Sequence, residues 1–222
     1  MQKAVKSLET LKVLFTHKEF VKRFLLIAYP WFCIGMTSYG LGFSVRLVKF
    51  DIFITSVIKN VVLFFVIILL IPAFEKLQRA PLLFVCYVLN GLAAIGYFII
   101  PPSFIASRVT MYIIATGLAS SSFFLVDAYT PEVFSTDSRN FAFSLLDSIS
   151  KLGTTIAPFI VDLGSTNDAG IPIAVFGCVM LSASAIFLFT PETNGKPLAQ
   201  NLNDLAYKWT DTMAERLISL CK

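Results

Sequence analysis

The sequence predicts an all-α membrane protein with six transmembrane helices, and three observations support this class. Of the 222 residues, 56% are hydrophobic and 14% are charged, and the mean hydropathy is +0.77, far more apolar than a soluble domain. The apolar residues gather in runs of about 20, the length that an α-helix needs to cross ~30 Å of hydrocarbon. The sequence lacks the short alternating segments of a membrane β-barrel.

The spans are expected to form one bundle over residues 24–190. Residues 1–23 carry leucines at helical spacing among lysines, which favours an amphipathic segment along the membrane surface or, as the alternative, a flexible linker. Residues 191–222 form a tail. Proline and glycine residues interrupt the connections between the apolar runs. The six spans are predicted at 24–43, 52–74, 82–100, 104–129, 141–161 and 171–190.

The distribution of basic residues predicts that both termini are cytoplasmic. Lys and Arg concentrate in cytoplasmic segments of membrane proteins. Most of the 18 Lys and Arg residues lie in the terminal segments and in the two connections on the same side, whereas the opposite side has Arg46, Lys49 and Arg108. Orientation in the membrane therefore explains the net charge of +4, and we predict no nucleic-acid partner.

Two polar stretches carry recognisable patterns. Residues 129–140 read Y-T-P-E-V-F-S-T-D-S-R-N, and residues 190–198 read T-P-E-T-N-G-K-P-L. The first resembles the loop between helices ten and eleven of organic cation and anion transporters (solute carrier 22-like), a branch of the major facilitator superfamily. The second resembles the signature that closes their last helix. Trp31-Phe32 and Tyr39-Gly40-Leu41 are similar to the W-F…Y-G-L pattern of helix seven.

This resemblance implies that the chain is the carboxyl-terminal half of such a transporter, with one half of the major facilitator fold. The implied function is transport of small organic ions by alternating access, in the plasma membrane. The partners would be the lipid bilayer, a small organic ion and a missing amino-terminal half or partner subunit, because one half has one wall of the pathway. One alternative is a truncated half that does not transport and associates with a full-length transporter. A second is a sugar-porter-like transporter, because sugar porters share a related E-x-F-P-x-x-x-R core.

Lys151 is the most informative residue of the expected substrate pathway. It lies near the middle of an apolar span, where a charge costs about 2.5–3.5 kcal/mol and should face a partner or a watery cavity. Its position resembles the one that carries Arg in anion transporters and Asp in cation transporters, which favours an anionic substrate. In the alternative interpretation, Asp147, four residues earlier on the same helix, neutralises Lys151 and both stabilise packing.

Five further residues are expected to line the pathway, namely Asp147, Asp127, Phe123, Phe124 and Tyr39. Asp127, Phe123 and Phe124 fall where the family's tenth helix lines it, and aromatic rings there could hold an organic cation or a planar ring. The hydroxyl of Tyr39 could reach the substrate. The alternatives are that the Phe residues fill the core or face lipid, and that Tyr39 belongs to an interfacial aromatic belt.

The resemblance also implies a cytoplasmic gate made of ion pairs. Glu75 to Arg79 occupies the place of the family's D-R-x-G-R-R loop, although Gln78 replaces the turn glycine and Ala80 the second Arg. The pairs would close the inner side in one state and break in another. Positive-inside anchoring by the arginines is the alternative. The residues assigned to this gate are Glu132, Arg139, Glu192, Glu75 and Arg79.

The sequence indicates no enzyme, metal or cofactor. It contains no H-E-x-x-H motif, no glycine-rich phosphate loop and no Ser-His-Asp set, and its one histidine, His17, lies outside the spans. No two of the four cysteines have metal-site or disulfide spacing in a polar loop.

Overall fold

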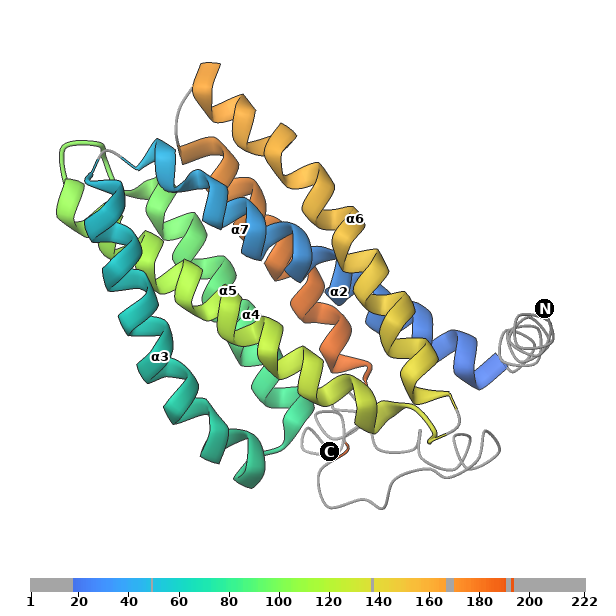
Figure 1. The fold of residues 1–222 in the computed structure, drawn as a ribbon. Helices are drawn as coiled ribbons and strands as arrows, with labels where there is room; N and C mark the ends of the chain where they lie inside the picture. The colour runs from blue at the N-terminus through green and yellow to red at the C-terminus, as the bar shows by residue number, and fades with distance from the viewer. Residues whose placement is uncertain (1–17, 49, 137, 167–169, 191–192, 194–222) are drawn as a thin grey trace, which may run out of the picture.

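The computed structural model is a bundle of antiparallel and parallel helices (Figure 1). It describes residues 18–48, 50–136, 138–166, 170–190 and 193. No strand occurs in these residues, so the predicted all-α class is confirmed. The elements are α2 (Lys18–Phe43), η1 (Ser44–Leu47), α3 (Ile52–Lys76), α4 (Arg79–Ile99), α5 (Ile105–Val133), α6 (Arg139–Thr166), α7 (Gly170–Ser184) and η2 (Ala185–Leu188).

In the described part of the chain, five helical segments are long and apolar enough to cross a membrane, namely Phe20–Leu47, Ile52–Lys76, Arg79–Ile99, Ile105–Val133 and Gly170–Leu188. Helix α6 has 28 residues and is therefore long enough to cross a membrane. It is not one of these five segments, because it is less apolar. Its sequence contains Asp147, Lys151 and Asp162, which lower its hydropathy. A sixth span at α6 stays a prediction.

Two helix pairs pack most closely, and facing small residues permit the approach. In the pair of α2 and α6, a Cβ on Gly153 would meet the carbonyl oxygen of Phe32 and would lie 3.3 Å from Met36 Cβ. In the pair of α4 and α7, a Cβ on Gly91 would lie 2.9 Å from the Gly177 carbonyl oxygen. These glycines let the helix backbones approach without a side chain between them.

We expect Gly153→Ala to destabilise the bundle by about 1–3 kcal/mol, the usual cost of overpacking. The added methyl group would meet the Phe32 carbonyl oxygen, which is backbone and cannot rotate away. Thermal unfolding of the purified chain in detergent measures the effect. Gly42→Ala is the matched control, because nothing lies within 4 Å of its Cβ position. Equal stability of the two variants would contradict this packing argument.

The bundle has an end, here called the Glu132 end, at which α2 begins and η2 finishes. Two clusters of buried residues form the core. The cluster nearer the Glu132 end includes Trp31 and Tyr87, and the other includes Tyr112 and Phe176. Some polar atoms in the core form hydrogen bonds between helices: Tyr112 donates to the Leu41 carbonyl oxygen at 2.5 Å.

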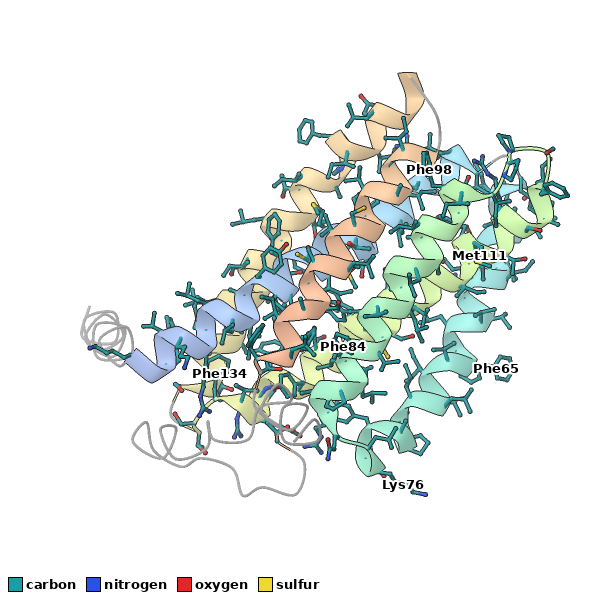
Figure 2. All side chains as sticks on the ribbon, turned by 180° about the vertical axis from the view of Figure 1, so that it is seen from behind. Phe65, Lys76, Phe84, Phe98, Met111 and Phe134 are labelled. Carbon is teal, nitrogen blue, oxygen red and sulfur yellow. The ribbon has the colours of Figure 1, made fainter. Side chains whose placement is uncertain are left out.

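Helix α3 lies at the side of the bundle next to α5 (Figure 1). Within Ile52–Lys76, all of which the structure describes, Thr55 is the one buried residue. Figure 2 shows Phe65 pointing away from the bundle and Lys76 at the end of the helix. The outer face of α3 is therefore an apolar surface that faces lipid or another protein body.

Candidate functional site

A cavity of about 310 Å³ lies between α2 and α5. Ser38 and Tyr39 line it from α2, and Ser120, Phe123 and Phe124 line it from α5. Three residues predicted for the pathway, Tyr39, Phe123 and Phe124, are thus placed together. The cavity combines aromatic faces with hydroxyl groups, a lining suited to a small organic molecule.

Lys151 lies beside this cavity on α6. Its Nζ is 5.8 Å from the ring centre of Tyr39, within the range of a cation–π interaction. The same Nζ is 3.4 Å from Asp147 Oδ1, and the two side chains are 54% and 43% exposed. The geometry accommodates both interpretations of Lys151: it is neutralised in part by Asp147, and it presents its charge at the cavity.

Asp127 adds a second carboxylate from α5. It is partly buried and interacts electrostatically with Asp147 and Lys151. Both carboxylates lie nearer the Glu132 end than the lysine, because α5 runs toward that end and α6 runs away from it. Lys151 contacts the Tyr39 ring at the cavity, and Asp127 follows the lining residues Phe123 and Phe124 by one turn of α5.

The two phenylalanines differ in their surroundings. Phe123 is partly buried, and its ring packs edge-on against Trp31 with ring centres 5.9 Å apart. Phe124 is 55% exposed. Phe123 therefore belongs partly to the core, as the alternative interpretation expects. Phe124 has an exposed ring face that a ligand can contact.

Two of the five predicted gate residues form an ion pair. Arg79, the first residue of α4, bonds through Nη1 to Glu132 Oε2 near the end of α5. Thr193 Oγ1 donates to the same carboxylate oxygen at 2.8 Å. The Arg79 guanidinium also lies over the ring of Phe74, 4.8 Å from its centre. These contacts tie α3, α4, α5 and Thr193 together at the Glu132 end.

Of the other three predicted gate residues, the two that the structure describes, Glu75 and Arg139, do not join this pair. Glu75 is exposed at the end of α3 and has no ion pair among the described residues. Arg139 begins α6, and its Nε and Nη2 atoms are buried with no hydrogen-bond partner in the described part of the chain. Glu192 lies outside the described residues.

Two structural contacts at this end were missed from the sequence. Arg23, which the sequence analysis assigned to a surface segment, is 2% exposed and donates from Nη1 to the Val133 carbonyl oxygen at 2.9 Å. There its charge faces the negative end of α5. Phe20 and Ile27, three residues before and four after Arg23, give the helical spacing that could have revealed its buried face. Trp31 donates from Nε1 to Thr130 Oγ1 at 2.9 Å.

No protein-family model matches the chain. It is 28% identical to Solute carrier family 22 member 6 of Mus musculus over 189 residues, which are 82% of this chain and 33% of that protein. The chain is a homologue of solute carrier family 22 transporters. It is also 26% identical to Organic anion transporter 3 of Oryctolagus cuniculus over 181 residues, 82% of this chain and 33% of the relative.

Organic cation transporter-like protein of Drosophila melanogaster is 25% identical over 191 residues, 86% of this chain and 34% of the relative. The chain therefore spans about a third of the length of the curated relatives that it matches. The solute carrier 22 resemblance read from the motifs is confirmed. These relatives are transporters and not enzymes.

Proposed function

We propose that this chain forms one wall of a transmembrane pathway for small organic ions. The observation that carries the proposal is the position of Lys151, half exposed and 5.8 Å from the Tyr39 ring at the cavity between α2 and α5. A charge within an apolar bundle is costly unless it faces water, a ligand or a counter-charge. The names of its relatives include both organic anion and organic cation transporters. The position of Lys151 and the names of the relatives therefore both support an organic ion as the cargo.

An anion is the favoured cargo. Lys151 lies over the Tyr39 ring at the cavity, whereas Asp147 and Asp127 lie toward the Glu132 end. An aromatic carboxylate would place its ring among Tyr39, Phe123 and Phe124 and its charge at Lys151. Benzoate is the simplest molecule with these two features, and benzyltrimethylammonium is a cation of related shape.

The Glu132 end is proposed to be cytoplasmic, with both termini on that side of the plasma membrane, in agreement with the basic residues there. The ion pair of Arg79 and Glu132 would then close the inner side. Alternating access requires a second wall, which would be supplied by a further six-helix half or a partner subunit. The exposed outer face of α3 and Phe159 of α6, 73% exposed, are apolar surfaces available to that body.

The same exposed surfaces favour a second candidate function, in which this half associates with a full-length transporter and alters its assembly without transporting.

Solute carrier family 22 relatives favour organic ions over the sugar-porter alternative.

Uptake by proteoliposomes tests the proposal. The chain is reconstituted alone and with the part of Mus musculus Solute carrier family 22 member 6 that precedes the matched region. We expect saturable uptake of labelled benzoate above that of empty vesicles when both halves are present. Absence of uptake of both benzoate and benzyltrimethylammonium from the combination would contradict transport. Lower uptake by the full-length relative when the chain is added would support the association function.

Asp147→Asn is expected to raise the affinity for benzoate about 2- to 5-fold, the factor that corresponds to the ~0.5–1 kcal/mol of a solvent-exposed ion pair. The substitution frees Lys151 from its partner at 3.4 Å. Binding of labelled benzoate to the purified chain measures it. Asp162→Asn, on the same helix fifteen residues further on, is the control and should leave the affinity unchanged. A lower affinity for Asp147→Asn would show that Asp147 positions the lysine.

A further inference from the structure

A second cavity, here called the α3–α5 cavity, lies between those two helices and has a volume of about 180 Å³. Leu70 and Phe74 of α3 and Phe124 and Leu125 of α5 contribute to its apolar walls. Glu75 is the one charged residue among the described residues that line it. A dry cavity of about 150 Å³ is large enough to hold a benzene ring, so this one can hold a ring or a short alkyl group.

Phe124 lines both this cavity and the larger cavity between α2 and α5. One exposed ring therefore contributes to the walls of both cavities. The charged groups beside them differ in sign: Lys151 lies over Tyr39 at the first, and Glu75 lines the second. A ligand that suits one cavity is disfavoured by charge at the other.

The carboxylate of Glu75 is available to a ligand. It lies in the last turn of α3 and is exposed, and no described residue forms an ion pair with it. Arg79 lies over the ring of Phe74, which lines the cavity. Glu132 pairs with Arg79 and neutralises it, so the guanidinium does not cancel the charge of Glu75.

The length of the α3 wall fits a molecule with an apolar body and one cationic end. The lining residues of α3 run from Ile67 to Glu75, a rise of about 12 Å along a helix. The carboxylate is at the Glu132 end of this wall, and the rest of the wall is apolar. The exposed ring of Phe124 offers a face for a cation or a second ring.

We propose that the α3–α5 cavity is a second ligand site and that it binds small organic ammonium ions. The apolar part of the ligand would lie between Leu70 and Leu125, and its ammonium group would lie at Glu75. The site is separate from the anion site at Lys151 and does not depend on transport by the chain.

Binding of labelled benzyltrimethylammonium to the purified whole chain in a neutral detergent tests this inference. We expect Glu75→Gln to lower the affinity about tenfold, the effect of losing one charge-assisted contact. Ala128→Phe is expected to abolish binding by filling the cavity, because Ala128 is an exposed lining residue whose enlargement leaves the core intact. Lys76→Gln is the matched control, since Lys76 is adjacent in sequence and does not line the cavity.

Benzoate binding to the same variants keeps the two sites distinct. It should be unchanged in Glu75→Gln, which shows that the variant is folded. Ammonium binding that depends on Glu75 would support the second site even if benzoate failed to bind and the proposed transport function were wrong. Absence of ammonium binding, binding unaffected by both Glu75→Gln and Ala128→Phe, or binding lost in Tyr39→Ala and retained in Glu75→Gln would each overturn it.

Discussion

Lys151→Glu is expected to weaken benzoate binding by at least about 100-fold and to convert the cavity between α2 and α5 to a preference for benzyltrimethylammonium. At a separation of ~7 Å and an effective dielectric constant of ~20, one unit charge contributes about 2–3 kcal/mol, and the substitution reverses that charge. The new carboxylate would join Asp147 and Asp127, so that no cation remained beside the Tyr39 ring. Binding and uptake of both labelled ions, measured side by side, report the change.

Two further variants show whether the effect of Lys151→Glu comes from charge at the cavity. Lys151→Gln removes the charge without reversing it and should give an intermediate loss of benzoate binding. Lys59→Glu changes the lysine within α3, which does not line the cavity, and should leave the ion preference unchanged. Unaltered benzoate binding in Lys151→Glu would show that Lys151 and Asp147 serve packing and that the substrate is held elsewhere.

The sequence predicted the helices well because apolar runs and their breakers act locally. The predicted spans 52–74 and 82–100 correspond to α3, Ile52–Lys76, and α4, Arg79–Ile99. The first helix begins at Lys18, six residues before the predicted start of its apolar run. Hydropathy alone does not place that start, but Thr16-His17-Lys18-Glu19 has the sequence of a capping box, which predicts a helix that begins near His17.

A sequence can suggest a candidate site where one residue type is exceptional in its surroundings. A lysine in an apolar span is conspicuous, and Lys151 was proposed in this way; its role in binding stays a prediction. The partners across helices were not predictable, because a single sequence contains no information on which helix faces touch. The hydrogen bond between Trp31 and Thr130 joins residues 99 positions apart. It links two motifs that the sequence analysis could only treat separately.

The predicted gate shows the same limit. Five charged residues could be assigned to one end of the bundle. The sequence could not show that Arg79 pairs with Glu132, 53 positions away, and not with Glu75, which precedes it at the end of α3. The choice has a geometric cause. The Arg79 side chain crosses from α4 to the end of α5, whereas Glu75 lines the α3–α5 cavity.

Arg79→Gln and Glu132→Gln are each expected to destabilise the bundle by about 1–3 kcal/mol, because each leaves a partly buried charge without its partner. The double variant should cost less than the sum of the two. Arg79 is at the positive end of α4 and Glu132 near the negative end of α5, so each charge alone opposes the dipole of its own helix. Thermal unfolding of the three variants gives the coupling energy, expected to be about 1 kcal/mol.

Glu75→Gln is the control for this cycle, because it removes a carboxylate at the same end that has no ion pair among the described residues. Strictly additive effects of Arg79→Gln and Glu132→Gln would contradict a coupled pair. Uptake by the double variant then separates the two interpretations of the pair. If the pair is a gate that breaks in one state, uptake should change even though stability is nearly restored. If it anchors the bundle, uptake should follow stability.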